Sequence, residues 1–524
     1  MNKEKKWLKQ RGYFHITKQI KREDYSKILP FLQDKKKISR HAFFPLLHKK
    51  IPQRRFKIIG YDNKNVPIRK HKKYNKKTEQ IEPTKKMRPI HYATHIDALI
   101  YAYYSNEIIQ EKYEKQLTET PDFSNCITAY RRIKTEDNLR NKNNIDFAKD
   151  VFDYIKERGE CCAMAFDIES FFTNLDHKIL KKAWFTLLGT SSLPPDHYNI
   201  FKSITNYSYI LLEDLKKHKG GFDEQQLALN RKEGIRAFFD SPNSLKEKIK
   251  AGELRICKNQ YHNKQNKVLR KIRGIPQGLP ISSMLANLYL LEFDRTIYQK
   301  VMVEMGGFYR RYSDDIVIVC DEKDIKVVQN LLVDEIKKYK LKISLGKTEI
   351  CIFKKQVVNE KKVLRSTGII TINKQEVTKA NYPFRYLGFE FYGDRTLIKS
   401  ANLSKFYRRM IYAVKTKAKR IKKIEERDLV TNAPLYKRKL YRIYSFHGKK
   451  SRELDIIRNR LIVNTSRQSF EYEQKLGKRK FRGNYLAYVE RASKIMKEPA
   501  IKRQLKNHWK ILKDAINRRI YGEI

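Results

Sequence analysis

The stretch FYRRYSDDIVIVC, residues 308–320, decides the fold of this chain because two adjacent carboxylates interrupt an otherwise aromatic and apolar run. Asp314 and Asp315 stand between the aromatic-basic segment FYRRY and the purely apolar segment IVIV. This order predicts a tight turn between two buried strands, with both charges at the turn. A solvated turn is the ordinary setting for such a pair, so a binding role requires a partner group elsewhere in the chain.

A third carboxylate has the same setting upstream. Asp167, in FDIESFF, follows the apolar run CCAMAF, which has the length of a buried strand. Two such strand ends can meet on adjacent strands of one sheet, where three carboxylates would repel each other strongly unless divalent cations bound them. Oxygen ligands of this kind suit Mg²⁺, and two such ions are what phosphoryl transfer requires. We therefore predict a two-ion Mg²⁺ site at these three residues, with Mn²⁺ as the alternative ion.

The composition indicates a nucleic-acid partner. Lys and Arg number 114 against 58 Asp and Glu, and a net charge of +56 would push a compact state apart unless a polyanion neutralised it. A biased genome would also enrich lysine, and this is the alternative explanation. With 524 residues the chain is too long for one core. Because no apolar run approaches the roughly 20 residues of a membrane span, we expect a soluble, cytoplasmic protein with no membrane partner.

Helical and strand-like patterns interleave along the chain without βαβ regularity, which predicts an α+β fold with an antiparallel sheet backed by helices. Residues 1–50 show helical spacing, whereas the strongly basic stretch at 54–88 predicts an exposed β-hairpin region. Residues 189–270 are polar, show no strong pattern and are interpreted as an insertion. Everything after residue 400 is basic and is predicted to be helical.

Five motifs, in order, resemble those of reverse transcriptases. YSDD (312–315) resembles the Y-x-D-D box, FDIESFF (166–172) the first palm motif, and GIPQGLPISSMLANLYL (274–290) the P-Q-G motif between them. LKISLGKTEI and FRYLGFEF resemble the lysine and primer-grip motifs that follow. The resemblance implies a right-hand polymerase fold. It places an N-terminal helical extension at 1–50, fingers at 51–158, an antiparallel-sheet palm at 159–398 with the insertion at 189–270, and a basic helical thumb at 399–524.

The resemblance also implies roles for single residues. Asp167 and Asp314 would ligate the ions, with Ile168 beside them and Asp315 as the less direct carboxylate. The nucleotide would contact Arg88 at its triphosphate, the peptide groups of Ser170 and Phe171, Phe172 under the sugar, Gln277 and Gly278, and Lys347 near the pyrophosphate. Primer and template would lie along Tyr130, Arg131, Tyr312, Ser313 and Gly388. Plain surface charges are the alternative for Arg88 and Lys347. Strand alternation would bury at most one of Phe171 and Phe172.

These roles describe an RNA-directed DNA polymerase with an RNA template, deoxynucleoside triphosphates and a DNA product. The insertion and the stretch RPIHYATHIDALIYAYYSNEIIQEKYE look most like the bacterial defence-associated reverse transcriptases, related to the abortive-infection group. That likeness implies a bacterial protein with an associated non-coding RNA and an antiphage role. The alternatives are an RNA-binding scaffold like the maturase of a group II intron element, and a template-independent DNA polymerase. The sequence leaves a homo-oligomer open.

Overall fold

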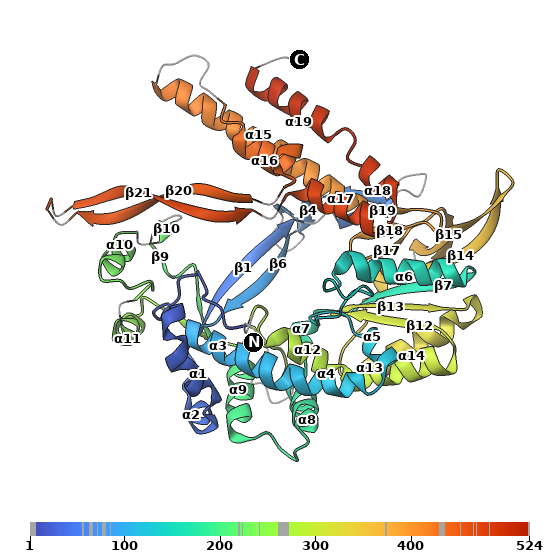
Figure 1. Ribbon diagram of the computed structural model, residues 1–524, viewed down its shortest axis with the longest axis horizontal. Helices are drawn as coiled ribbons and strands as arrows, with labels where there is room; N and C mark the ends of the chain where they lie inside the picture. The colour runs from blue at the N-terminus through green and yellow to red at the C-terminus, as the bar shows by residue number, and fades with distance from the viewer. Residues whose placement is uncertain are drawn as a thin grey trace.

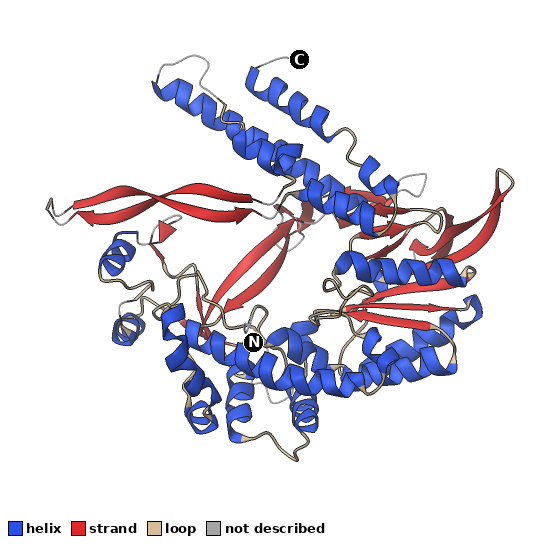
Figure 2. Cartoon of the chain, viewed as in Figure 1, coloured by secondary structure: helices blue, strands red, loops and turns tan. Residues whose placement is uncertain are grey.

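The computed structural model of the chain describes residues 7–54, 57–61, 67–70, 72–75, 80–83, 85–217, 221–222, 224–239, 241–259, 272–372, 375–428, 435–450, 452–464, 466–467, 469–481 and 483–521. Helices and strands alternate along these ranges (Figure 1; Figure 2). Together with an antiparallel central sheet, this content confirms the predicted α+β fold class. Among the helices described here, none is both long enough and apolar enough to cross a membrane.

A six-stranded sheet lies at the centre of the fold, in the order β12-β13-β7-β14-β15-β16, and every neighbouring pair is antiparallel. The stretch at 308–320 forms the predicted hairpin, β12 and β13, with the two carboxylates at its turn. The strands are β7 (Cys161–Asp167), β12 (Phe308–Tyr312), β13 (Asp315–Cys320), β14 (Glu349–Val358), β15 (Lys361–Ile372) and β16 (Gln375–Ala380).

Alternation along these strands sends side chains into two separate cores. Met164 and Ile318 pack in the core that includes helices α8 (His177–Leu188), α12 (Ser282–Tyr289), α13 (Leu291–Ile297) and α14 (Ile325–Lys338). Ala163 and Val317 pack in the second core, with helix α6 (Asn144–Arg158) and the small sheet β17 (Phe384–Tyr386), β18 (Phe389–Phe391) and β19 (Thr396–Ile398). Strands β7 and β13 are therefore covered on both faces, whereas β16 is exposed along its whole length.

A second sheet joins segments far apart in the sequence, in the order β11-β8-β1-β6. Strands β1 and β6 are antiparallel, whereas β8 runs parallel to β1. The two hairpins β2–β3 and β4–β5 lie between β1 and β6 in the chain and confirm that the basic stretch forms hairpins. The strands are β1 (Leu46–Arg54), β2 (Lys57–Tyr61), β3 (Pro67–Lys70), β4 (Lys72–Asn75), β5 (Gln80–Pro83), β6 (Lys85–Tyr92), β8 (Ser208–Leu211) and β11 (Ile256–Lys258).

The polar segment at 189–270 is structured where it is described, which the sequence did not predict. It contributes β8 and β11 to the second sheet, and its other elements are α9 (Pro195–Thr205), β9 (Lys216–Lys217), β10 (Gly221–Phe222), α10 (Glu224–Lys232) and α11 (Pro242–Lys250). Strands β8 and β11 have only four and three residues, too few to show a period. Strand β8 pairs with β1, which lies far upstream, so no local pattern reveals this pairing, and β11 in turn pairs with β8.

Several helices come from the N-terminal part of the chain, before and after the strands β1–β6. Within the helical extension predicted at 1–50, the described residues form α1 (Tyr25–Gln33), with Pro30 inside it, and α2 (Lys35–Arg40). The prediction is wrong for residues 46–50, which begin strand β1. Three helices follow β6, namely α3 (His95–Tyr103), α4 (Gln110–Thr118) and α5 (Pro121–Cys126). Short 3₁₀ or π segments are Arg22–Asp24, Tyr104–Ile109, Tyr298–Glu304, Glu322–Asp324, Leu345–Lys347, Phe446–Gly448 and Asn517–Tyr521.

A long β-hairpin lies within the C-terminal part, so the prediction that everything there is helical is wrong. The strands β20 (Arg452–Asn464) and β21 (Ser469–Phe481) separate α15 (Ser400–Asp428) and α16 (Arg438–Tyr444) from α17 (Tyr485–Ile495), α18 (Pro499–Arg503) and α19 (His508–Ile516). The strand sequence RELDIIRNRLIVN is rich in β-branched residues, which favour strands. The strand also contains basic residues, like the helices before and after it in the chain. This shared composition is why the sequence analysis predicted a helix here.

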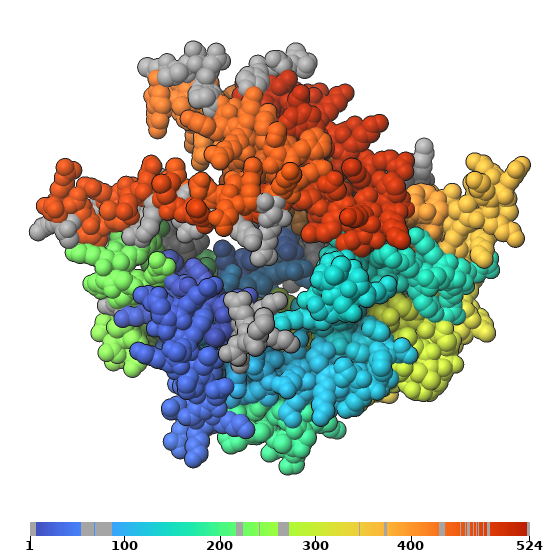
Figure 3. Space-filling model, in the orientation of Figure 1, coloured from blue at the N-terminus to red at the C-terminus, as the bar shows by residue number. Residues whose placement is uncertain are grey.

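A hollow lies at the centre of the molecule. Figure 3 shows it between the blue N-terminal residues, the teal segment around α6 and the orange-red hairpin β20–β21. Figure 1 shows that the ends of β7 and β13 beside helix α7 (Phe171–Asn174) are turned towards this hollow. The carboxylate turn of the central sheet therefore faces an open space rather than a packed core.

A fully buried ion pair lies beneath the carboxylate turn. The guanidinium of Arg311 donates to Asp294, with 2.7 Å from Nε to Oδ1, and both side chains are 0% exposed. A second arm of Arg311 donates to the carbonyl oxygen of Ser313 at 3.1 Å and to the amide oxygen of Asn287 at 3.3 Å. The ion pair thus supports the backbone of the turn directly, one residue before Asp314.

We predict that Arg311→Met lowers the free energy of unfolding by about 3–5 kcal/mol, because it leaves the Asp294 carboxylate buried without its partner. The double variant Arg311→Met, Asp294→Leu should recover part of that loss, since it removes both charges together. Denaturant unfolding followed by circular dichroism measures the difference. A double variant as unstable as the single one would show that the ion pair is not the cause.

Candidate active site

Strand pairing brings the three predicted carboxylates to one end of the central sheet. Asp315 is the register partner of Asp167 across β13 and β7. The N–H of Ile168 donates to the carbonyl oxygen of Asp314 at 3.1 Å, which fixes the turn against the strand. Ser313 adopts a φ of +61°, so the turn reverses the chain within two residues and leaves Asp314 and Asp315 adjacent to Asp167.

The carboxylates lie in a strongly negative environment. Burial, followed by the charges of Asp314 and Asp167, raises the pKa of Asp315 to about 7. Burial and the charge of Asp167 also raise the pKa of Asp314 above its ordinary value. Carboxyl groups that repel each other in this way hold protons or cations at neutral pH. Such perturbed groups facing an open hollow are typical of a functional site.

Two lysines and an arginine partly offset this charge. Lys347 forms an ion pair with Asp167, and its ammonium is half-exposed. Lys347 and Lys399 both lower the pKa of Asp315, while Arg88 lowers that of Asp314. Lys399 was missed by the sequence reasoning, although it directly follows β19 of the primer-grip hairpin. The only sequence signal for Lys399 was its position after the primer-grip motif, because nothing in the neighbouring sequence distinguishes it from other lysines.

The carboxylates offer the oxygen ligands that Mg²⁺ takes, and their raised pKa values reflect negative charge that a divalent cation would offset. The donor chemistry therefore fits the predicted ions. Among the described residues, however, no three His, Cys, Asp or Glu side chains are already grouped closely enough to hold a metal ion. Asp167 is paired with Lys347 instead, so ion binding at Asp167 requires that ammonium to move away.

The P-Q-G turn holds the strand that carries Arg88. The carbonyl oxygen of Gln277 accepts the N–H of His91 in β6 at 2.8 Å. Gly278 has a φ of +108°, and a Cβ there would lie 2.7 Å from the carbonyl oxygen of His91. Glycine at this position therefore allows a close backbone approach to β6, while the contact of Gly278 with the nucleotide stays a prediction. The exposed side chain of Arg88, three residues before His91, is positioned through this contact.

The first palm motif leaves the strand immediately after Asp167. Ser170 has a φ of +48°, and Phe171 and Phe172 lie in helix α7, so the argument from strand alternation does not apply to them. Phe171 is nevertheless buried, at 3% exposed, while Phe172 is only partly buried. The carbonyl oxygen of Phe172 accepts the N–H of Ile275 at 2.9 Å, which ties this motif to the P-Q-G segment.

The pre-palm segment AYRR (129–132), with Tyr130 and Arg131 predicted along primer and template, contains one residue that the structure contradicts as a template contact. The side chain of Arg131 is only 4% exposed, and its Nε donates to Glu114 at 3.0 Å while Nη1 donates to the carbonyl oxygen of Ile127 at 2.7 Å. The predicted role for Arg131 is therefore wrong, because its donors are used inside the protein. Tyr130 differs: it is 48% exposed, and its hydroxyl lies 3.3 Å from the Ser313 hydroxyl at the carboxylate turn.

The primer-grip motif forms a tight hairpin next to the same site. Gly388 has a φ of +96° in the turn between β17 and β18, and its carbonyl oxygen accepts the N–H of Lys399 at 3.0 Å. This contact keeps Lys399 near Asp315. Tyr312, the last residue of β12, is partly buried and packs its ring against Phe147. The structure thus brings Asp167, Lys347, Lys399 and Tyr130 to the carboxylate turn, whereas the Arg131 side chain is used inside the protein.

Comparison with known proteins identifies the family of this fold. A family model described as "Reverse transcriptase (RNA-dependent DNA polymerase)" matches residues 68–391, a span that contains all three carboxylates and the whole central sheet. The chain belongs to the reverse transcriptase family. Its fold is thus a right-hand polymerase fold. Following the predicted division of the chain, which stays a prediction, we refer to the central sheet as the palm, to β1–β6 with the helices that follow as the fingers, and to the C-terminal elements as the thumb. No curated protein matches the chain.

Solved structures with distant similarity include telomerases. An apo telomerase from Candida Tropicalis, truncated from the C-terminal domain, has 10% identity and a TM-score of 0.35 over 73% of this reverse transcriptase and 61% of that chain. A Candida albicans telomerase in complex with a TWJ fragment of telomeric RNA has 13% identity and a TM-score of 0.34 over 75% and 53%. The chain thus spans little more than half the length of these proteins, and the likeness adds no argument beyond the family match.

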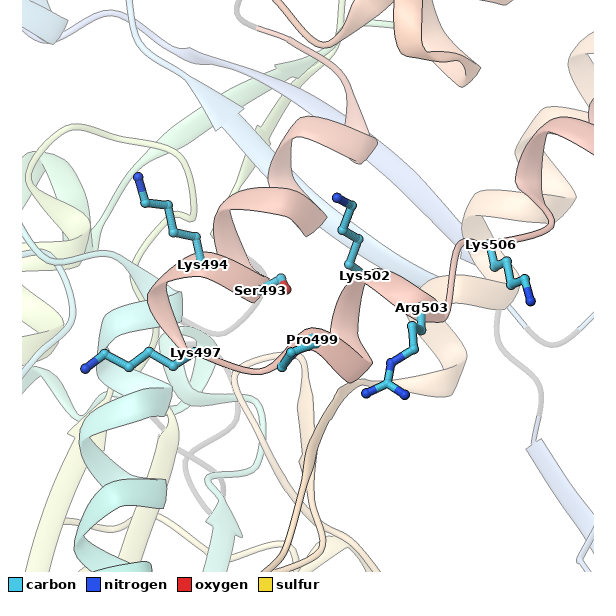
Figure 4. A pocket seen from close by; sticks show the side chains of 7 residues that line it. All are labelled: Ser493, Lys494, Lys497, Pro499, Lys502, Arg503 and Lys506. Atoms are coloured by element: carbon cyan, nitrogen blue, oxygen red, sulfur yellow. The ribbon is translucent and has the colours of Figure 1, made fainter.

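A basic hollow lies on the C-terminal helices, outside the carboxylate site. It has a volume of about 560 Å³ and is lined by Ser493, Lys494, Lys497, Pro499, Lys502, Arg503 and Lys506 (Figure 4). The one acidic residue in this stretch, Glu498, is turned away, because its carboxylate accepts the N–H groups of Thr396 and Ala500, each at 3.2 Å. Among the described residues, no carboxylate pairs with these five cations, so the hollow concentrates positive charge.

We predict that Asp315→Asn stabilises the metal-free protein at pH 8 but hardly at pH 4. With a folded pKa of about 7 and an ordinary value of 3.8, the folded state binds more protons than the unfolded state between these pH values. Stability therefore falls as the pH rises from about 4 to about 7, and the Asn variant escapes this loss. Because the Asp315 residue is exposed, solvent screens the effect, and we expect the difference to be about 1 kcal/mol.

Thermal unfolding in chelator at several pH values measures this difference between Asp315→Asn and the natural protein. Added Mg²⁺ at pH 8 should raise the midpoint of the natural protein more than that of the variant, because the variant lacks one charge that attracts the ion. Parallel pH profiles for the two proteins would contradict the assigned cause.

Proposed function

We propose that this protein is an RNA-directed DNA polymerase that makes cDNA from deoxynucleoside triphosphates on an RNA template. The observation that carries the proposal is the register of the palm sheet, which places Asp167 opposite Asp315 with Asp314 at the adjoining turn. The family match over these residues supports it. A protein that only bound RNA would gain nothing from repelling carboxylates next to an anionic partner.

The carboxylates are proposed to hold two divalent ions, Mg²⁺ or alternatively Mn²⁺. Asp167 and Asp314 would be the main ligands, joined by Asp315 and by the backbone of Ile168 next to the Asp314 carbonyl group. When bound, such ions lower the pKa of the attacking primer hydroxyl and offset charge on the transferred phosphate. Lys347, which now pairs with Asp167, is then free to approach the pyrophosphate leaving group.

The surrounding motifs are proposed to hold the nucleotide and the primer. Arg88 offers two parallel donors to the triphosphate from β6, a geometry that suits phosphate oxygens. The partly buried Phe172 ring would lie under the sugar and leave a ribose 2′-hydroxyl without a partner, which favours deoxynucleotides. The remaining proposed contacts are the peptide groups of Ser170 and Phe171, the turn at Gln277 and Gly278, and Tyr130, Tyr312, Ser313 and Gly388 along primer and template.

An RNA partner is proposed from charge. The net charge of +56 and the unpaired cations of the basic hollow favour binding to a phosphate backbone outside the carboxylate site. The resemblance to bacterial defence-associated reverse transcriptases supports a non-coding RNA as the partner, an antiphage role and a bacterial cytoplasmic location. Untemplated DNA synthesis is the second candidate activity, because the same carboxylates would serve it.

The double variant Asp314→Asn, Asp315→Asn should lose DNA synthesis while keeping its fold and its RNA. Asn preserves shape but removes the charge that attracts the ions. Incorporation of labelled deoxynucleotides with Mg²⁺, measured with and without added RNA, tests this. Synthesis by the variant would place the active site elsewhere. Synthesis by the natural protein that ignores the RNA would favour the untemplated polymerase, and none at all would favour a maturase-like scaffold.

Replacing Lys494, Lys497 and Lys502 with Gln should weaken RNA binding and flatten its dependence on salt. Each lost phosphate contact reduces the slope of log affinity against log salt by about 0.7, so three contacts change it by about 2. The matched control replaces Lys248, Lys300 and Lys337, which lose the same charge but are already paired with Glu253, Glu304 and Asp334. Equal slopes in both triple variants would show that only net charge matters. Filter binding over a salt series gives these slopes.

A further inference from the structure

The hairpin β20–β21 extends far beyond the helices that carry it. Its two 13-residue strands pair along their whole length, from Arg452 with Phe481 to Asn464 with Ser469. At about 3.3 Å per residue such a ribbon reaches about 40 Å. Its base is fixed by the buried side chain of Leu454 and by a hydrogen bond of 3.2 Å from Arg452 to the carbonyl oxygen of His447.

Most of the hairpin lies outside any core. Ile457, Tyr472 and Leu476 expose 62%, 72% and 75% of their surface, so the described outer part packs little apolar area against the C-terminal helices. An isolated two-stranded ribbon is barely stable in water and needs support from another element. That support comes from helix α10, which lies against β20. Figure 1 shows the hairpin crossing from the C-terminal helices to α10 at the far side of the molecule.

Helix α10 belongs to a part of the chain that is fixed to the fingers. Its segment shares a small core with β1 and β8, and the carbonyl oxygen of His15 accepts the N–H of Phe238 at 2.9 Å. Arg231 of α10 also lies over the ring of Phe14, at 5.6 Å from its centroid. The hairpin thus contacts a body that is distinct from the thumb elements that carry it.

These contacts close a circuit around the central hollow. One core joins the fingers to the palm, and the other joins the palm to the C-terminal helices. The contact between β20 and α10 joins the C-terminal helices back to the fingers. Figure 3 shows the hollow beneath the hairpin, inside this circuit. Helix α10 is only nine residues long and buries Leu227, Ala228 and Asn230, so this contact has far less apolar packing than the two cores.

We propose that the hairpin and α10 form a closure that encircles the nucleic acid lying at the carboxylates. The inference rests on the proposed function in one respect, namely that the enclosed strand is the nucleic acid on which the polymerase acts. Because the contact between β20 and α10 is small, it opens to admit a strand, whereas the two packed cores stay intact. Once closed, it retains the strand by topology, without needing sequence-specific contacts, so a long template stays bound through many additions.

The test asks whether closing the ring traps RNA that has no ends. Cys257, the one native cysteine that is not buried, is replaced with Ser, and Leu229 of α10 is replaced with Cys. A second cysteine is placed in turn at Ile457, Ile462 and Asn464, which lie in the part of β20 beyond Asp455. A short, reducible thiol crosslinker then identifies the pair that closes the ring. Failure of all three pairs to crosslink would overturn the contact itself.

The crosslinked pair is loaded with circular or linear RNA of the same sequence before closure and then washed at high salt. We expect the circle to stay bound, the linear RNA to be lost, and the circle to be released when the crosslinker is reduced. Protein closed before the RNA is added should retain neither. Equal loss of circular and linear RNA, or uptake of circles by protein that is already closed, would overturn the encirclement. Single-cysteine variants control for crosslinking to RNA.

Two further variants separate this inference from the proposed polymerase activity. The closed pair carrying Asp314→Asn and Asp315→Asn should still trap circular RNA, because trapping needs no chemistry. A shortened hairpin, in which an Asn-Gly turn joins Asp455 to Lys478, keeps the first four strand pairs but cannot reach α10. It should add a single nucleotide normally and lose long products. Unchanged product length in the shortened variant would show that the closure has no role in retention.

Discussion

The buried ion pair between Arg311 and Asp294 underlies the whole arrangement of the active site. An ion pair without solvent is stable only when its remaining donors also find partners, and Arg311 places its other arm on Ser313 and Asn287. Asn287 in turn donates to the carbonyl oxygen of Ala129 at 2.8 Å, just before Tyr130. One guanidinium thereby joins the carboxylate turn, the helix after the P-Q-G motif and the pre-palm segment. Each of these elements depends on the others for its position.

A second constraint couples the fingers to the palm. The backbone of Gly278 lies so close to β6 that a side chain there has no room. This contact holds the strand that carries Arg88 in a fixed position relative to the carboxylates. The end of the central sheet that carries Asp167, Asp314 and Asp315 concentrates negative charge, although the chain as a whole has a net charge of +56. That contrast explains why the site attracts small cations while most of the surface favours an extended polyanion. The basic hollow on the C-terminal helices belongs to that second, cationic part.

Much of the palm could be predicted from sequence because its signals are local. The hairpin around Asp314 and Asp315 followed from an apolar run broken by two charges, and the strand before Asp167 from its length and composition. Side-chain alternation is a property of any strand, so the two faces of the sheet could also be anticipated. The interleaving of strands and helices indicated the fold class, and the ordered motifs indicated the reverse transcriptase family.

The rest depended on contacts between distant residues. The role of Arg131 was mistaken because nothing in AYRR shows that Glu114 would take up its guanidinium. The short strand β8 exists only because β1 offers it an edge, and Lys399 approaches Asp315 only because the primer-grip turn holds its backbone. A sequence states which charges and side chains are available and with what period they recur. Which of them meet, and which are neutralised inside the protein, is decided only when remote elements pack together, because burial and pairing are properties of the folded chain.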